Sequence, residues 1–283
     1  MHNKDSSAES VTQSVLEFYS HLAFNQTEMI SDLVDEVRRT DPLDLYPCLR
    51  GLIKNKVRVL EIGCGVGWFS NSLNLRHKAQ VTGVDINPVA IERALLTASS
   101  LGTTNQFVVS DLFGYAPESK FPFVVSLGVL HHTYDCHAAI KRVCSEFVET
   151  GGHFLLGLYH EHGRRPFLDH FRLMSESGAS NELLLSEFRR LRGSSIDSTH
   201  LESWFRDQVL HPHETQHTYA EVRALLKSQD FEVISTSINK FQPITSHEAL
   251  EAKELEFASV SKQALADGRY FPGFFVVLAR RNT

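Results

Sequence analysis

The segment His211–His217 has the sequence "HPHETQH" and contains the spacing H-E-x-x-H. On a helix this spacing places two zinc-binding histidines on one face, with the glutamate as the general base of a metalloprotease. Zinc binding of this kind requires a helix running through His213 and His217. However, Thr218 and Glu221 have the spacing of a capping box, which predicts that the helix begins only at Thr218. We therefore expect residues 211–217 to form a loop, and we assign no metal ligands in this chain.

Three roles remain open for this loop, which contains His211, His213, Glu214 and His217. The side chains could orient or deprotonate a substrate, because histidine titrates near neutral pH. They could bind a metal ion outside the protease pattern. The default interpretation is a hydrogen-bonded loop that anchors the helices preceding it.

A second chemical pattern is the glycine-rich segment "EIGCGVGW", which begins at Glu61 and has glycines at 63, 65 and 67. Glycine allows a sharp strand-to-helix turn and lets a ligand approach the backbone. A dinucleotide fingerprint would require its third glycine at the position of Trp68. The spacing E-x-G-x-G-x-G is instead that of proteins that bind S-adenosylmethionine, a ligand without phosphate. A tight turn without a ligand is the alternative.

Two acidic residues follow predicted strands further along the chain. Asp85 ends the second strand, where a carboxylate can accept hydrogen bonds from both hydroxyls of a ribose. Asp111 ends the third strand, where it could accept from an adenine amino group with Leu112 beside the ring. Ligands of open α/β sheets bind beyond the carboxyl ends of the strands, so these positions favour a nucleoside site.

The elements that must position these residues alternate between strand and helix. Short β-branched runs predict strands at 57–63, 79–85, 105–111, 121–128, 153–159, 231–238 and 273–280. Asn87 and Pro88 predict a helix start, Gly102 predicts its end, and a further helix is expected at 136–148. Gly151-Gly152 is expected to turn the chain into the fifth strand. This alternation predicts an α/β fold with a parallel sheet covered on both faces.

Four segments resemble, in order, the signature segments of class I S-adenosylmethionine-dependent methyltransferases of the type-11 (UbiE-like) group. They are "VLEIGCGVGWFS", "VTGVDINPVAIERA", "FVVSDLF" and "FVVSLGVLHHTYD". The resemblance is close over about residues 55–160 and looser over 218–238 and 271–280. It implies a Rossmann-like sheet of seven strands and S-adenosylmethionine as the cofactor.

The resemblance also implies which residues contact that cofactor. Glu61 and Gly63 would face the methionine amino group, Asp85 the ribose, Asp111 with Leu112 the adenine, and Gly128 the sulfonium, with Tyr19 reaching in from the N-terminal helices. Gly65 and Ile86 are expected to contact the cofactor as well. We expect a helical lid at 1–50, the cofactor-binding core at 51–160, a helical cap insertion at 161–217, and the rest of the core at 218–283 with a helical insertion at 241–270.

Candidate catalytic residues are His132, which follows the fourth strand, and His211 and His213 of the loop. A histidine near its normal pKa suits removal of a proton from an acceptor oxygen or nitrogen. A histidine that only hydrogen-bonds the loop backbone is the alternative for His132. In the cap, Arg164-Arg165 could hold an anionic acceptor, but a solvated arginine pair is the default expectation. The aromatic residues Phe167, Phe171, Trp204 and Phe205 are expected to pack its core or to line an apolar acceptor pocket.

Composition narrows the partners of the 283-residue chain. Its formal charge of −6 comes without a basic stripe, which argues against nucleic acid. No apolar run approaches the length of a membrane span, and "MHNKDSSAES" lacks an export signal, so we expect a cytoplasmic protein. Four irregularly spaced cysteines fit reduced packing residues. Neither oligomeric state nor the identity of the acceptor follows from the sequence.

The sequence therefore predicts an enzyme that transfers a methyl group from S-adenosylmethionine to oxygen or nitrogen of a small-molecule acceptor. One alternative keeps the cofactor but attacks its aminobutyrate chain, cyclising it and releasing methylthioadenosine. A second alternative is a non-catalytic protein that binds S-adenosylmethionine.

Overall fold

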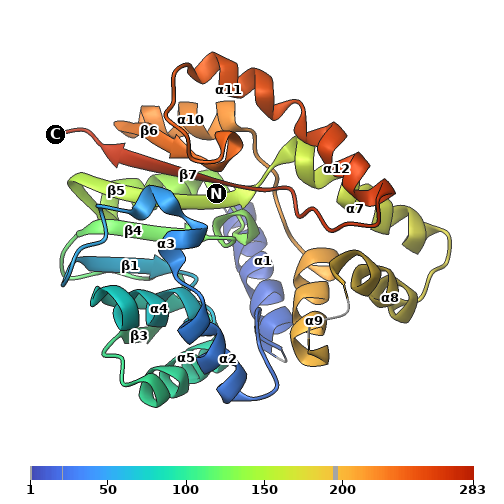
Figure 1. Ribbon diagram of the computed structural model, residues 1–283, viewed down its shortest axis with the longest axis horizontal. Helices are drawn as coiled ribbons and strands as arrows, with labels where there is room; N and C mark the ends of the chain where they lie inside the picture. The colour runs from blue at the N-terminus through green and yellow to red at the C-terminus, as the bar shows by residue number, and fades with distance from the viewer. Residues whose placement is uncertain (1, 21, 194–196) are drawn as a thin grey trace.

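A central sheet organises the chain (Figure 1). The computed structural model describes residues 2–20, 22–193 and 197–283. Within these residues the sheet has seven strands in the order β3-β2-β1-β4-β5-β7-β6, which confirms the expected Rossmann-like, seven-stranded α/β fold. Met1 and His21 of the predicted lid, and residues 194–196 of the predicted cap, lie outside the described residues.

Each predicted strand is present. The strands are β1 (Arg58–Ile62), β2 (Gln80–Asp85), β3 (Gln106–Val109), β4 (Phe121–Leu127), β5 (Val148–Tyr159), β6 (Phe231–Thr236) and β7 (Phe274–Arg281). The pairs from β3 to β5 are parallel, as expected. The expectation of a parallel sheet is wrong for β7, which runs antiparallel between β5 and β6.

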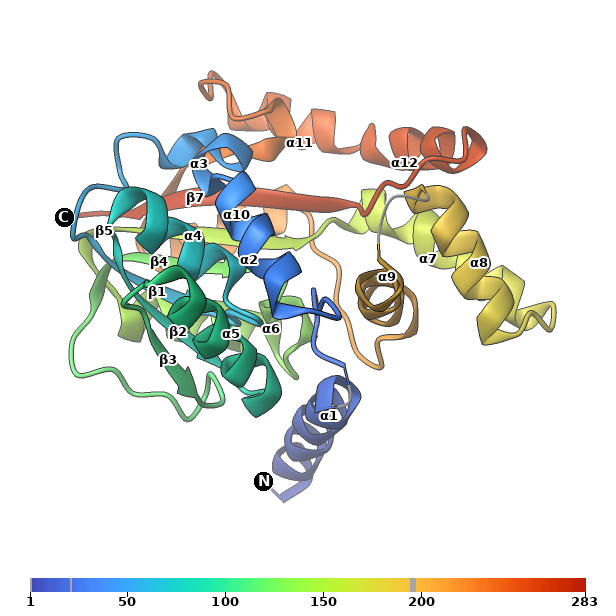
Figure 2. The ribbon, with the colours of Figure 1, turned by 60° about the horizontal axis from the view of Figure 1, so that its bottom comes forward.

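One face of the sheet is covered by N-terminal helices, seen stacked together in Figure 2. These are α2 (Ile30–Arg39), α3 (Pro42–Leu45) with the short turn Pro47–Leu49, α4 (Trp68–His77) and α5 (Pro88–Leu101). Phe69 and Leu73 of α4 pack there against Val59, Phe123 and Val125 of the strands. Because both faces are covered, the central strand β4 is buried along most of its length rather than at alternate residues.

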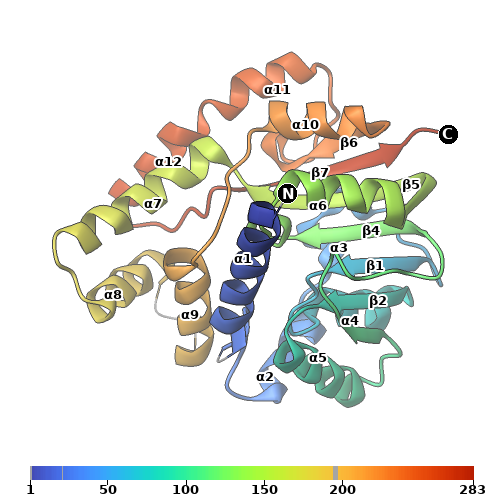
Figure 3. The same ribbon diagram turned by 180° about the vertical axis from the view of Figure 1, so that it is seen from behind.

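The opposite face carries α6 (Cys136–Arg142), α10 (Tyr219–Ser228) and α11 (His247–Glu254), as Figure 3 shows for α6 and α10. Ile140 of α6 and Val222 of α10 lie in one core with Leu60 and Val124 of the strands. The predicted capping box is confirmed: Thr218 and Glu221 each accept from the other's backbone N–H. The predicted caps of α5, Asn87 and Gly102, are confirmed as well.

The cap lies beyond one end of the sheet, toward which β1 points (Figure 1). It consists of α7 (Glu161–Glu176), α8 (Asn181–Arg192) and α9 (Ser198–Phe205), which continues in a π turn at Arg206–Leu210. Helix α12 (Phe257–Ala266) packs on α7. The C-terminal end of α1 (His2–Ser20) contacts the π turn that follows α9, where Arg206 donates to the Phe18 carbonyl oxygen. Phe167, Phe171 and Phe205 form the cap's own core, which confirms their expected packing role.

Two local expectations are wrong. Gly151 and Gly152 do not precede the fifth strand but lie inside β5, where the pairing with β4 shifts in register. The strand expected at 231–238 ends at Thr236, because residues Ser237–Asn239 form a 3-10 turn. No helix among the described residues is long and apolar enough to cross a membrane.

The turn from β1 to α4 is where glycine is required. Gly63 has a φ of 71°, and a Cβ there would lie 2.2 Å from a Val129 methyl group. Gly67 has a φ of 78° and lies against Ala94 of α5. Gly65 also has a positive φ, 50°, but a Cβ there would meet nothing within 4 Å. Gly63 and Gly67 thus allow neighbouring residues to pack closely against the turn, whereas the space beside Gly65 is open.

This difference predicts the effect of two alanine substitutions. Gly63→Ala should destabilise the fold by about 1–3 kcal/mol through overpacking, in addition to the ~1–2 kcal/mol of a positive φ. Gly65→Ala should cost only the ~1–2 kcal/mol that a positive φ requires of alanine. Urea denaturation of both variants measures this, and equal midpoints would contradict the packing assigned to Gly63.

Candidate functional site

A cavity of about 760 Å³ opens at the carboxyl ends of β1, β2 and β4 and extends to α1 and α9. Its size is that of pockets that bind drug-sized ligands. All nine residues predicted to contact a cofactor line it: Tyr19, Glu61, Gly63, Gly65, Asp85, Ile86, Asp111, Leu112 and Gly128. His132 also lines the cavity, whereas His211 and His213 are not among the described lining residues.

Glu61 is a buried carboxyl group in the cavity wall. The side chain is buried because its strand, β1, is covered on both faces of the sheet. Its side chain accepts a hydrogen bond from the Ser70 hydroxyl. Burial raises the pKa of Glu61 to about 8, so the group is mostly neutral at pH 7 without a ligand. A cation bound beside it would favour the charged carboxylate.

Asp85 and Asp111 hold the turns that follow their strands. The Asp85 carboxylate accepts from Gly65 N at 2.8 Å and from Asn87 N at 2.9 Å. It therefore joins the glycine-rich turn to the start of α5, and burial raises its pKa. Asp111 Oδ1 accepts from Phe113 N at 2.5 Å. Both carboxylates keep lone pairs for a ligand in the cavity.

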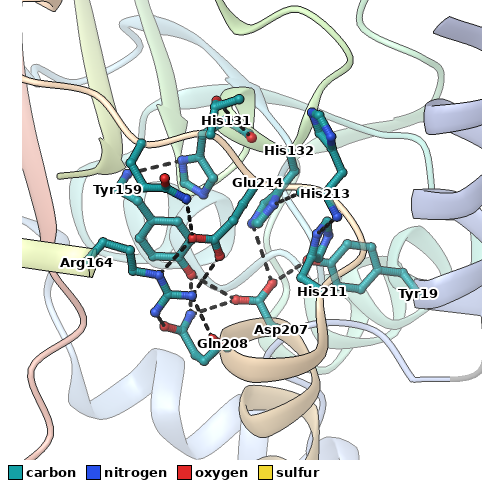
Figure 4. Close-up of polar contacts among 12 residues, drawn as sticks. Tyr19, His131, His132, Tyr159, Arg164, Asp207, Gln208, His211, His213 and Glu214 are labelled. Atoms are coloured by element: carbon teal, nitrogen blue, oxygen red, sulfur yellow. Dashed lines mark hydrogen bonds and ion pairs between the residues drawn. The ribbon is translucent and has the colours of Figure 1, made fainter. Parts of the chain in front are cut away.

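His132 also lines the cavity and lies beside Asp207 (Figure 4). His132 Nδ1 lies 2.8 Å from the His213 carbonyl oxygen, to which it must donate. In the neutral ring, Nε2 then carries a lone pair, and it has no hydrogen-bond partner among the described residues. Nε2 lies 3.9 Å from Asp207 Oδ1. Burial lowers the pKa of His132 to about 4, so the ring is neutral at pH 7. The expectation of a histidine near its normal pKa is therefore wrong for the protein without ligand, and the buried ring is a weaker base than expected.

The Asp207 carboxylate accepts hydrogen bonds from three neighbouring side chains. It accepts from the Tyr19 hydroxyl, from Gln208 Nε2 at 2.7 Å and from the Tyr159 hydroxyl at 3.2 Å. Burial raises the pKa of its carboxyl group, although His211 and Tyr19 oppose that effect. The result is a carboxylate held opposite His132 at the junction of α1, β5 and α9.

His211 and His213 both contact His132, the first through its ring and the second through its backbone carbonyl. The ring of His211 lies 3.7 Å from that of His132, centroid to centroid, and also contacts Phe18 and Tyr19. Burial lowers the pKa of His211 to about 3. His213 provides the carbonyl that orients His132, while its Nε2 lies 3.1 Å from the Thr133 carbonyl oxygen. The structure thus brings His132 to the cavity, whereas His211 and His213 contact His132 and other residues around it.

Arg164 corrects a sequence expectation. Arg165 is exposed as expected, but the Arg164 side chain is fully buried. Its guanidinium donates to both carboxylate oxygens of Glu214, at 3.0 and 2.8 Å, and to the side chain and backbone of Gln208. Burial alone would raise the pKa of Glu214, but Arg164 outweighs it and lowers that pKa. The expectation that both arginines are solvated is therefore wrong for Arg164.

Asp207 and Gln208 were missed as site residues. Gln208 lies at helical spacing from Leu201, Trp204 and Phe205, so a polar residue on an apolar helix face was the available signal. The π turn at Arg206–Leu210 adds one residue to the helical turn and brings Asp207 inward too. That irregularity has no clear sequence signal.

The buried ion pair predicts a large loss of stability when its carboxylate is removed. Glu214→Gln should cost about 3–5 kcal/mol, because a buried guanidinium keeps its desolvation cost without its counter-charge. Asp44→Asn, which breaks the exposed pair with Arg50, is the matched control and should change the urea midpoint little. Similar losses in the two variants would show that Arg164 is not held by charge.

Comparison with known proteins places the chain in a family. A family profile described as a methyltransferase domain matches residues 28–236. Ubiquinone biosynthesis O-methyltransferase of Yersinia pestis (strain Pestoides F) is 31% identical over 122 residues, which are 41% of this chain and 49% of that protein. The chain thus spans about half the length of the curated relatives it matches.

Solved structures show the same fold. Magnesium protoporphyrin IX methyltransferase from Synechocystis PCC 6803, with S-adenosylhomocysteine bound, has a TM-score of 0.53 at 16% identity and covers 99% of this chain and 97% of its own. The plantazolicin methyltransferase in complex with S-adenosylhomocysteine has a TM-score of 0.52 at 15% identity, covering 99% of each chain. The glycine-rich turn, the ordered carboxylates and these matches agree, and the chain belongs to the class I S-adenosylmethionine-dependent methyltransferases.

Proposed function

We propose that the protein binds S-adenosylmethionine in this cavity and transfers its methyl group to oxygen or nitrogen of a small-molecule acceptor. The observation that carries the proposal is the shared lining of one cavity. Glu61, Asp85 and Asp111, at the carboxyl ends of three adjacent strands, line this cavity together with His132 and Asp207. A cofactor and an acceptor can therefore meet between them.

Each carboxyl group suits one part of the cofactor. Glu61 is buried and suits the ammonium group of the methionine part, because a cation stabilises its charged form. Asp85 suits the ribose diol, since its carboxylate is already oriented by two backbone amides. Asp111 with the buried Leu112 suits the adenine, and Gly128 leaves backbone exposed where the sulfonium would pass.

Transfer from an activated sulfonium depends mainly on aligning the acceptor with the methyl group. Where the acceptor must lose a proton, we propose His132 Nε2 as the base. The proton would convert His132 to a cation 3.9 Å from Asp207 Oδ1, so the new charge forms beside an opposite one. His211 and His213 act as positioning residues that hold the ring.

The nature of the acceptor follows from the cavity and from the relatives. Trp204, Tyr270 and Phe274 line the acceptor side, so an apolar or aromatic molecule fits. The names of two relatives, a ubiquinone biosynthesis O-methyltransferase and a magnesium protoporphyrin IX methyltransferase, also point to small organic acceptors.

All four cysteines lie within the described residues as free thiols, which supports the proposed cytoplasmic location.

The buried Glu61 predicts how cofactor binding depends on pH. Its pKa of about 8 means that, below this pH, binding of the ammonium group must release a proton from the carboxyl group. Affinity for S-adenosylmethionine should therefore rise with pH between about 5.5 and 7, by up to about tenfold per unit. Over this range the cofactor's own amino group, with a pKa of roughly 8, stays protonated.

Isothermal titration of wild type and Glu61→Gln measures this effect. The variant should bind more weakly and show a flatter dependence on pH, because its amide does not titrate. An equal rise in affinity in both proteins would assign the proton release to another group.

The reaction itself is tested by mass spectrometry of the nucleoside products formed from S-adenosylmethionine, with and without a desalted metabolite extract. S-adenosylhomocysteine should form only with extract, and the acceptor should gain one methyl group. Asp85→Asn should lose cofactor binding, whereas His132→Gln should lower kcat and keep the affinity for S-adenosylhomocysteine. His170→Gln, in the cap, is the control. Methylthioadenosine formed without extract would contradict methyl transfer, and so would a protein that binds no cofactor at millimolar concentration.

A further inference from the structure

A second cluster of histidine and carboxylate lies outside the cavity, between α6 and α10. Its members are His137 of α6, His217 at the end of the loop, and Glu221 in the first turn of α10. One ligand atom from each lies within 4.8 Å of the others. None of the three lines the cavity as described, so the proposed methyl transfer leaves the cluster without a role.

The two rings converge on one oxygen. His137 Nε2 lies 2.5 Å and His217 Nδ1 lies 3.2 Å from Glu221 Oε1. The ring centroids of the two histidines are 5.6 Å apart. Helix α6 and the segment 217–221, which are distant in sequence, thus present three possible ligand atoms to one point.

The hydrogen bonds of Thr215 orient His217. The Thr215 hydroxyl donates to the His131 carbonyl oxygen at 3.2 Å, so it accepts from His217 Nε2 at 2.9 Å. The proton of the neutral His217 ring is then on Nε2, and Nδ1 directs a lone pair at the Glu221 carboxylate. With this tautomer, Nδ1 and Glu221 Oε1 are two acceptors 3.2 Å apart, and either a further proton on Nδ1 or a bound metal ion satisfies both.

The backbone fixes this lone pair in place. His217 N donates to the Tyr159 carbonyl oxygen and His217 O accepts from Glu161 N, both at 2.9 Å. Glu221 is fixed by the capping box with Thr218. In metal sites, a ligating histidine usually donates its other ring N–H to an oxygen in just this way.

We propose that His137 Nε2, His217 Nδ1 and the Glu221 carboxylate bind a divalent transition-metal ion, with zinc as the ion best matched to two imidazoles and one carboxylate. Three protein ligands of these types leave the fourth position of a tetrahedral site to water. The side chains of His137 and Glu221 are 45% and 37% exposed, so solvent reaches that position. The exposed His137 side chain can move away from Glu221 to the separation that a shared ion requires.

The proposed metal ion would stabilise the fold and would take no part in the reaction. The same loop that ends at His217 carries Glu214, which binds Arg164, and His213, whose carbonyl orients His132. A metal ion that ties this loop to α6 and α10 would stabilise the fold around the cavity without touching the substrate. The H-E-x-x-H spacing thus contributes His217 to a site, but not the pair of helical histidines of a protease.

The test is zinc binding by the untagged full chain after dialysis against a chelator, measured by competition with a chromophoric zinc indicator. Wild type should bind one equivalent, and zinc should raise its melting temperature, because binding to the folded state stabilises it. His137→Ala and Glu221→Gln should each lose this site and the shift. Glutamine at 221 still satisfies a capping box, so the fold of α10 is kept. These readouts do not depend on methyltransferase activity.

His170→Ala is the matched control, since His170 also pairs with a glutamate, Glu187, at 2.8 Å. It should bind zinc like wild type. Thr215→Val should weaken binding by about tenfold, the effect expected for loss of a hydrogen bond that orients a ligand. Absence of zinc binding by wild type, or equal binding by Glu221→Gln, would overturn the proposal and leave the cluster a hydrogen-bonded ion pair.

Discussion

The buried guanidinium of Arg164 is the constraint on which the site depends. A charge fully removed from water must be paired and hydrogen-bonded within the protein. Arg164 meets this requirement with Glu214 from the loop and Gln208 from the end of α9, and it stacks on Tyr159 with its guanidinium carbon 3.9 Å from the ring centroid. One side chain thereby fixes the end of β5, the cap and the loop relative to one another.

Several properties of the acceptor end follow from this arrangement. With Glu214 held by Arg164, the loop places the His213 carbonyl against His132 Nδ1, which fixes the ring tautomer. With Gln208 held, the π turn keeps Asp207 opposite His132 Nε2. The end of the cavity therefore presents a neutral base beside a carboxylate, and both are oriented before any ligand binds. Such preorganisation is how a methyltransferase contributes to a reaction whose donor is already activated.

The sequence predicted most of the cofactor end and little of the acceptor end. Glu61 lies in β1, Asp85 ends β2 and Asp111 follows β3. Parallel strands bring their carboxyl ends to one edge, so periodicity with the family resemblance placed these residues together. The β7 direction, the register shift at Gly151-Gly152 and the burial of Arg164 depend on long-range packing that no local pattern encodes. Asp207 is the clearest case, because a π turn turns it inward. The capping box at Thr218 correctly excluded a protease helix, whereas the contact of His217 with His137 needed the fold.

The central claim is that one cavity holds the cofactor at the strand ends with its sulfur directed toward His132 and Asp207. A crystal structure with S-adenosylhomocysteine tests this most directly. The account predicts the ribose hydroxyls on Asp85, the amino group beside Glu61, and the sulfur between Gly128 and the His132 end of the cavity. A ligand bound elsewhere, or one whose sulfur points away from His132, would contradict it.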